Sequence, residues 1–292
     1  MDHSLSDTQI GSSGTFISSS NLFDTPSTTL QDAVPVTSSS SDFSSYPDER
    51  VDGKMAAQPG LSFKQTAEAM TSFLEVAIHT ILCIRQIYPS TTFTRRRAHG
   101  VPVYQSRHPQ VRSYISEVVA LIGKEMLAGN MRRVTLVVKT IDTGLPLERF
   151  IFDMGYLDSS KRQEGHLRDA PLLGAPGVDE LSLMLRGFMI RLTALDGQLE
   201  DNRGETTFAI VVETKDDLEP ATNQPTDGSI PPWVPALQAD TLRPPSDDPD
   251  CVAEHEPLLN VRAVETGVID IRLMVQECVA KTGVEHLHIE TG

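Results

Sequence analysis

Apolar residues between positions 62 and 89 recur at the spacing of an α-helix. Ser62 followed by Gln65 has the form of a capping box, which marks the start of a helix. Behind it the apolar residues return every three or four positions: Met70, Phe73, Leu74, Ala77, Ile78, Ile81 and Leu82. We therefore expect a long helix with a broad apolar face, which ends by Pro89.

Two further stretches have the same spacing. His108-Pro109 places a proline where the first turn of a helix tolerates one, and the stripe behind it is Val111, Tyr114, Ile115, Val118 and Ile122. Asp179 has the side chain of an N-cap, and the stripe behind it is Leu181, Met184, Leu185, Phe188, Leu192 and Leu195. The pattern thus predicts three helices.

Other segments have the pattern of strands. RRVTLVVKTID and PLERFIFDM flank Thr143-Gly144 and predict an antiparallel hairpin, and TFTRRRAHGVPVYQS resembles a second one. TTFAIVVET predicts a strand after the third helix, and a later strand alternates through Ile269, Ile271, Leu273 and Val275. These elements predict an α+β domain with three helices packed on an antiparallel sheet.

Polar stretches divide the chain into four parts. Residues 1–60 are rich in Ser and Thr without a sustained period, and they predict a disordered tail. We assign 61–214 to the core, 215–280 to a Pro/Asp-rich segment with closing strands, and 281–292 to a C-terminal tail. Because the chain returns to the sheet after the Pro/Asp-rich segment, that segment is tethered at both ends. A long aperiodic segment inside a compact domain is commonly disordered or functional.

Composition limits the function. The chain has 292 residues, of which 39% are hydrophobic, enough for a core, and a net charge of −15, which argues against direct nucleic-acid binding. Cys83, Cys251 and Cys278 lack close pairing, which favours a reducing compartment. We find neither a signal peptide nor an apolar run long enough to span a bilayer, so we expect no membrane binding and a place in the cytosol or nucleus.

The sequence contains no strong enzymatic motif. It lacks a Gly-rich phosphate loop, a G-x-S-x-G elbow and an H-E-x-x-H pair, so we expect no catalytic residue, cofactor or metal. His286 and His288, with Glu285 and Glu290, could be drawn as a metal cluster, but such spacing arises by chance near a terminus. The run 95–97 of three arginines is more typical of a solvated hairpin edge than of a phosphate site.

Three segments carry a resemblance to a known family. FLEVAIHTILCIRQIYP, VPVYQSRHPQVRSYI and LMLRGFMIRL resemble HORMA-domain proteins and, among them, the small accessory subunits of DNA polymerase zeta. The resemblance runs from about Phe63 to Glu277. It implies a HORMA fold whose C-terminal segment acts as a safety belt, closing around a partner peptide that docks as an added strand. Spindle-checkpoint proteins of the same fold are the neighbouring branch.

The resemblance implies a peptide pocket. Tyr114 and Trp233 match aromatic residues that line the pocket for prolines of the partner peptide, and Pro235 stands where the family has leucine. Aromatic faces suit proline because its rigid ring loses little entropy on docking. From the residues alone, Trp233 could instead pin the belt to the domain, and Tyr114 could be ordinary core.

The resemblance also implies a dimerisation surface. Arg186 matches an arginine used in HORMA–HORMA dimerisation, although its spacing also suits the polar flank of a helix. The neighbouring dimer positions hold Gln86, Arg95 and Gly197.

The third implied surface contacts a Y-family scaffold polymerase. It falls on Leu258, Arg272 and Met274, of which Arg272 and Met274 replace the family's Gln and Tyr. Leu258 could instead anchor the belt.

The implied function is that of a nuclear, non-catalytic adaptor in mutagenic translesion synthesis at damaged DNA. It would clamp a proline-containing peptide of the catalytic subunit of DNA polymerase zeta and bridge it to the Y-family scaffold polymerase, a deoxycytidyl transferase. A second HORMA domain, as homodimer or heterodimer, and an AAA+ remodelling ATPase are the other implied partners. One alternative is a spindle-checkpoint HORMA protein that binds a different peptide, and another is an enzyme with an unrecognised site. Peptide preference would distinguish the first alternative from the adaptor, and turnover by the isolated protein would reveal the second.

Overall fold

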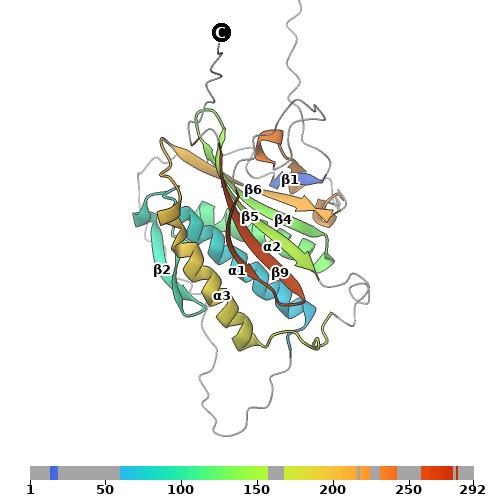
Figure 1. Ribbon diagram of the computed structural model, residues 1–292. Helices are drawn as coiled ribbons and strands as arrows, with labels where there is room; N and C mark the ends of the chain where they lie inside the picture. Colours follow the sequence, from blue (N-terminus) through green and yellow to red (C-terminus); the bar gives the residue numbers. More distant parts are fainter. Residues whose placement is uncertain are drawn as a thin grey trace, which may run out of the picture.

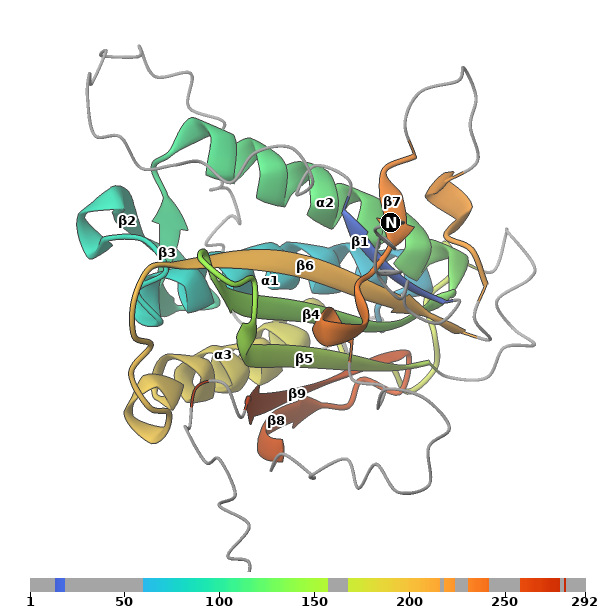
Figure 2. The ribbon, with the colours of Figure 1, turned by 90° about the horizontal axis from the view of Figure 1, so that it is seen from above.

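The fold consists of helices on one face of an antiparallel sheet (Figures 1 and 2). It was analysed in a computed structural model that describes residues 14–18, 60–156, 168–215, 218–223, 231–241, 258–278 and 281. These residues form three α-helices, a seven-stranded sheet of order β7-β1-β6-β4-β5-β9-β8, and the separate hairpin β2-β3. The α+β arrangement expected from the sequence is confirmed.

Helix α1 (Phe63–Ile84) forms the centre of the core. Ser62 Oγ accepts from the Gln65 N–H at 3.2 Å and Gln65 Oε1 accepts from the Ser62 N–H at 2.9 Å, so the expected capping box is present. By length and composition α1 could cross a membrane, contrary to our expectation for the sequence. Its apolar residues are instead buried against the other helices and the sheet, which accounts for that composition.

Helices α2 (Pro109–Ala128) and α3 (Val178–Thr193) complete the helical layer. α2 begins with a proline after His108 and ends at Gly129, whose φ of 77° lies in the left-handed region that favours glycine. α3 is capped by Gly177, so the prediction of Asp179 as its N-cap is wrong. Asp179 lies in the first turn, where a carboxylate meets the positive end of the helix dipole.

Three long strands form the middle of the sheet. They are β4 (Met131–Thr140), β5 (Pro146–Tyr156) and β6 (Thr206–Thr214), with Leu136 of β4 opposite Phe150 of β5 and Ile210 of β6. These three side chains belong to the core shared with the helices. β2 (Phe93–Ala98) and β3 (Val101–Ser106) form the separate hairpin, preceded by the 3-10 helix η2 (Ser90–Thr92). The expected strands and hairpins are therefore confirmed.

Strand β1 (Thr15–Ser18) belongs to the N-terminal part of the chain but lies within the sheet. The expectation that residues 1–60 carry no regular structure is wrong for this segment. The reason is that its partners, β6 and β7, lie about two hundred residues away in the sequence, where a reading of local composition cannot find them.

The C-terminal part returns to the sheet as expected. After β6 come the 3-10 helix η7 (Ala221–Asn223), β7 (Trp233–Pro235), the 3-10 helix η8 (Gln238–Asp240), β8 (Leu258–Val264) and β9 (Ile269–Glu277). β7 forms one edge of the sheet, β8 forms the other, and β9 lies between β8 and β5. The two ends of this segment thus lie at opposite edges of one sheet. A further 3-10 helix, η5 (Leu195–Gln198), follows α3.

Candidate functional site

The described parts of residues 215–280, which we call the belt, occupy both edges and the outer face of the sheet. The outer face is the one opposite the helices. There Lys139 Nζ of β4 lies 2.9 Å from the carboxylate of Asp240, and the Arg149 guanidinium of β5 donates to the Ala239 carbonyl at 2.8 Å. η8 therefore lies across β4 and β5, between the edge formed by β7 and the edge formed by β8 (Figure 2).

Strand β1 fills a slot whose walls are β6 and the belt strand β7. It is antiparallel to both: Phe16 lies opposite Val212 of β6 and opposite Pro235 of β7. The Thr214 N–H donates to the Gly14 carbonyl at 3.0 Å, and the Ala236 N–H donates to the Thr15 carbonyl at 3.0 Å. The slot thus binds an extended segment through its backbone, a mode in which alternate side chains provide selectivity.

Side chains of β1 fill both faces of the slot. Phe16 is 8% exposed and belongs to the main core on the helix side. Ile17 points to the outer face and packs against a small apolar cluster of Val137, Val211 and Ala236. The slot therefore accepts two adjacent apolar side chains, one on each side of the sheet.

Trp233 fastens β7 to the end of α2. It is 1% exposed, and its indole N–H donates to Thr222 Oγ at 3.1 Å. The backbone N–H of Thr222 in turn donates to the carboxylate of Glu125, a buried residue of α2, at 2.7 Å. The Asn223 amide accepts from the Trp233 N–H and donates to the Trp233 carbonyl, at 3.0 and 2.9 Å. These contacts agree with the alternative in which Trp233 pins the belt to the domain.

Tyr114 and Pro235 contact the slot from different positions. The Tyr114 ring packs edge-on against Phe208 of β6, with centroids 5.7 Å apart, so it lies along a wall strand of the slot but beyond the residues that pair with β1. Pro235 lies in β7 directly opposite Phe16. Two of the three predicted pocket residues, Trp233 and Pro235, thus belong to the β7 wall of the slot, and Tyr114 packs against the opposite wall, β6. Binding of prolines by the three stays a prediction.

The four predicted dimerisation residues are all exposed: Gln86 follows α1, Arg95 lies on β2, Arg186 lies in the middle of α3, and Gly197 lies in η5. Gln86 and Gly197 each follow one member of the ion pair between Arg85 and Asp196, which joins the end of α1 to η5. The guanidinium of Arg186 lies beside Gly100, where a Cβ would be in van der Waals contact with it. Gly100 lies in the turn of the hairpin that also carries Arg95. Their role in dimerisation stays a prediction.

The structure brings the three predicted scaffold-contact residues to one surface. Leu258 lies opposite Gln276, and Met274 and Arg272 follow along β9 at alternate positions, so all three side chains share the outer face of the β8–β9 edge. Leu258 is 49% exposed. The partner itself stays a prediction.

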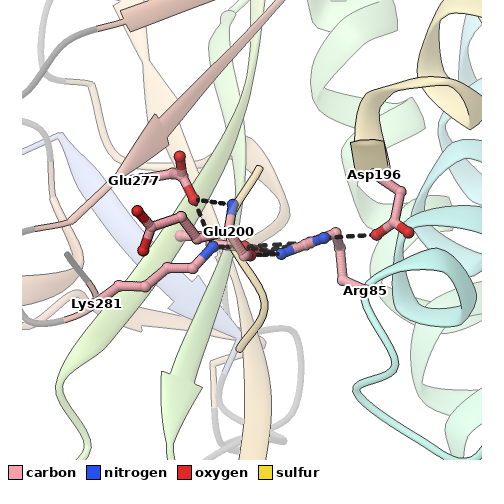
Figure 3. Close-up of polar contacts among 6 residues, drawn as sticks. Arg85, Asp196, Glu200, Glu277 and Lys281 are labelled. Carbon is pink, nitrogen blue, oxygen red and sulfur yellow. Dashed lines mark hydrogen bonds and ion pairs between the residues drawn. The ribbon is translucent and has the colours of Figure 1, made fainter. Parts of the chain in front are cut away.

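A buried charged cluster closes the helix layer onto the sheet (Figure 3). The guanidinium of Arg85, which follows α1, reaches the fully buried carboxylate of Glu148 on β5 at 2.6 Å and the carboxylate of Asp196 at 2.5 Å. It also donates to the backbone carbonyl of Glu200. A buried carboxylate of this kind is stable as a charge only because charged groups and donors surround it.

Lys281, the residue after the belt, joins the same cluster. Lys281 Nζ lies 2.5 Å from Glu148 and 2.5 Å from Glu277, and Glu277 accepts from the Glu200 N–H at 2.9 Å (Figure 3). Lys281 thus ties the chain beyond β9 to the core. Sequence reasoning missed this cluster, because its members are spread from position 85 to 281. Glu148 offered one signal, because alternation along β5 places it on the same face as Phe150 and Phe152.

The described residues offer little to covalent chemistry. Burial raises the pKa of the Cys83 thiol to about 11, so the thiol stays protonated at neutral pH and is a poor nucleophile. Burial, aided by Arg112, lowers the pKa of His79 to about 4. Cys251 and the histidines near the C-terminus, 286 and 288, lie outside the described residues. What the site can do is bind an extended chain.

A strand held between a sheet and a belt defines a peptide-clamping class of fold, and comparison with known proteins identifies its family. The family model described as "HORMA domain" matches residues 66–225, more than half of the chain. The chain therefore belongs to the HORMA-domain family, as the resemblance implied.

Relatives within the family come from two functional groups. The chain is 27% identical over 225 residues to "Mitotic spindle assembly checkpoint protein MAD2B" of Gallus gallus, covering 74% of this chain and 93% of that protein. It is 32% identical over 131 residues to "DNA polymerase zeta processivity subunit" of Arabidopsis thaliana, covering 44% and 54%. Among solved structures, a chain of "Crystal Structure of Mitotic Checkpoint Complex" has a TM-score of 0.55 at 24% identity, over 73% of this chain and 99% of that one.

Proposed function

We propose that the protein is a non-catalytic adaptor subunit of translesion DNA polymerase zeta that clamps a peptide of the catalytic subunit under its belt. The observation that carries the proposal is the slot between β6 and β7, which holds an extended segment by backbone pairing on both sides. Pairing of this kind gives affinity that depends little on sequence, and the pockets for alternate side chains give selectivity.

The choice of polymerase zeta rests on the relatives. The Arabidopsis relative is named as a processivity subunit of that polymerase. In this proposal Trp233, Tyr114 and Pro235 select a proline-containing segment. The net charge of −15 suits an adaptor that leaves DNA contact to its partners.

Other surfaces have proposed partners in the same assembly. Leu258, Met274 and Arg272 form the contact for the Y-family scaffold polymerase, and their shared outer face supports that role. Arg186, with the exposed residues around it, pairs with a second HORMA domain, and an AAA+ ATPase reopens the belt. The site of action is the nucleus.

A binding experiment with the full chain tests the proposal. Fluorescent peptides tiled along the proline-containing segments of the catalytic subunit from the same organism would be titrated against the wild type, Tyr114→Ala and Pro235→Leu. Tyr114→Ala is expected to weaken one tile by about 1–3 kcal/mol, as for an aromatic hot spot. Pro235→Leu restores the family's residue and is expected to alter affinity without abolishing binding.

The matched control is Leu183→Ala, which truncates a large apolar side chain that is 67% exposed on α3. It is expected to leave affinity unchanged. Trp233→Ala is expected to weaken binding as well, and because Trp233 is buried its unfolding curve must be recorded beside the titration. Failure of every tile to bind the wild type, these variants and a chain whose residues Phe16 and Ile17 are changed to Glu would refute the polymerase zeta assignment.

A second candidate function is that of a spindle-checkpoint protein of the same fold. It is favoured by the MAD2B relatives, which are named as mitotic spindle assembly checkpoint proteins, and by the fold shared with the mitotic checkpoint complex chain. Such a protein would bind a different peptide by the same belt. Capture of a checkpoint-type peptide, with no binding of any polymerase tile, would select this candidate.

A further inference from the structure

The slot under the belt is occupied by a segment of the chain itself. Both edges of β1 are paired, with Phe16 and Ile17 aligned to β6 on one side and to β7 on the other. A strand offers only two hydrogen-bonding edges, so β6 and β7 cannot pair with another strand at these positions while β1 lies between them.

We propose that residues 14–18 are a built-in ligand of the slot, bound in the same chain, which a partner peptide must displace. This inference rests on the proposed function, because the partner peptide is the competitor. It gives the chain two states: a self-occupied state with the belt closed over β1, and a partner-bound state with β1 released.

The fit of β1 supports the inference. Thr15 is 4% exposed, Phe16 8% and Ser18 1%, so three of its four side chains are buried. Phe16 joins the main core, and Ile17 joins the small cluster on the outer face. A segment of random composition would not place an apolar side chain on each face and small polar ones at both ends. The segment contains no proline, and the apolar side chains that it places in the slot are the adjacent residues Phe16 and Ile17.

Attachment to the same chain strengthens this ligand. Residues 19–59 link β1 to the start of the core, and a chain of that length reaches on the order of 130 Å when extended, which is ample for the same molecule. A tethered ligand acts at an effective concentration of about millimolar order. A free peptide therefore binds with an affinity reduced by the fraction of molecules whose slot is open.

The test uses the full chain and a labelled peptide of residues 11–20. Phe16→Glu/Ile17→Glu removes both apolar side chains of β1 and leaves the slot residues unchanged. Ser19→Glu/Ser20→Glu adds the same charge to the neighbouring residues and serves as the control. We expect the Phe16/Ile17 variant to bind the labelled peptide saturably, and the wild type and the control to bind it at least about tenfold more weakly.

Hydrogen exchange supplies a second readout that needs no partner. In the wild type, the amides of residues 15–18 are expected to be protected independently of protein concentration. Free exchange at these amides, together with no binding of the labelled peptide to any variant, would overturn the proposal. A wild-type dimer by light scattering that dissociates in the Phe16/Ile17 variant would also overturn it, since β1 would then occupy the slot of a second copy.

Partner peptides separate this proposal from the proposed function. Tighter binding of a polymerase tile to the Phe16/Ile17 variant than to the wild type supports both. Equal binding of a tile to both chains overturns the built-in ligand and leaves the adaptor function standing. Binding of the 11–20 peptide without binding of any tile supports the built-in ligand and counts against the adaptor function.

Discussion

Asn223 takes the place of a neighbouring strand for Trp233. Its amide donates one hydrogen bond to the Trp233 carbonyl and accepts one from the Trp233 N–H, while the other edge of β7 pairs with Ser18 of β1. A side-chain amide carries both a donor and an acceptor, so it can satisfy a buried peptide unit in the way that a strand does. An edge strand of three residues can therefore hold a fully buried tryptophan.

Removal of this amide is expected to loosen β7. Asn223→Ala leaves a buried N–H and C=O without partners, and each such group costs about 1–3 kcal/mol. We expect faster amide exchange at residues 233–236 and a lower free energy of unfolding by about 2 kcal/mol. The control is Asn260→Ala, at an exposed position of β8, which should change neither. Unchanged exchange at β7 in Asn223→Ala would contradict the assigned role.

His79 is expected to make stability depend on pH. Burial first, and then the positive charge of Arg112, lowers its pKa in the folded state to about 4, and its Nδ1 faces the Ser106 N–H at 3.5 Å. In the unfolded chain its pKa is about 6.5. The stability associated with neutral His79 is therefore fully present above pH 6.5 and is lost as the pH falls towards 4, because only the unfolded state gains the proton.

The size of this effect follows from the two pKa values. The free energy of unfolding should fall by about 1.4 kcal/mol per pH unit across this window, or about 3 kcal/mol in total. Urea titrations of the wild type and His79→Gln at pH 7, 6, 5 and 4.5 measure the two slopes. A shallower slope in His79→Gln is expected, whereas equal slopes would assign the acid sensitivity to carboxylates alone.

At the scale of elements, the cluster around Glu148 of β5 links the end of α1, the 3-10 helix η5 and the chain after β9. Its carboxylate meets Arg85, which follows α1, and Lys281, which follows the belt, and Arg85 also binds Asp196 of η5. Loss of one partner leaves the others buried without a counter-charge, which is more costly than loss of an exposed pair.

Glu148→Gln tests that difference. We expect it to lower the free energy of unfolding by about 3 kcal/mol, since Arg85 is almost fully buried and loses its main carboxylate. The control is Asp169→Asn, which makes the same change in an exposed pair with Lys64 at 3.7 Å and should cost less than about 1 kcal/mol. Similar costs in denaturant titrations of the two variants would show that the cluster is no more than a surface pair.

The sequence was sufficient to predict those elements whose signals lie in neighbouring residues. The capping box at Ser62, the proline at the start of α2 and the alternation of β9 each depend on neighbouring residues, and each was predicted correctly. β1 was missed because four residues carry too little period to stand out, and its stability comes from strands distant in sequence. The slot residues of β7 were found through family resemblance, while Asn223 and Glu148, whose partners are distant or lack a motif, were not.

At the scale of the whole molecule, one segment of chain controls both edges of the sheet. β7 covers β1 at one edge, and β8, paired with β9, forms the other edge, with β6, β4 and β5 between the two pairs. The belt is continuous in sequence from one edge to the other. We therefore expect release of β7 to be coupled to the attachment of β8 and β9, because all three strands belong to one segment of chain.

This coupling predicts an effect at long range. Lys281→Met removes the contact with Glu148 at the β9 end and leaves the slot untouched. If β1 leaves only when the belt opens, amide exchange at residues 15–18 should accelerate about tenfold, which corresponds to about 1.4 kcal/mol in the opening free energy. Exchange at β9 should accelerate as well, because its end loses an anchor.

The control for this experiment is Lys64→Met, which makes the same substitution in an exposed ion pair with Asp169. It should leave exchange at both β1 and β9 unchanged. Faster exchange at β9 with unchanged exchange at β1 would mean that β1 slips out beside β7 while the belt stays closed, and enclosure would then contribute nothing to retention of a bound segment. Faster exchange at both β1 and β9 would show that the belt opens as one unit, because a lysine that follows β9 would then affect a strand on the opposite side of the sheet.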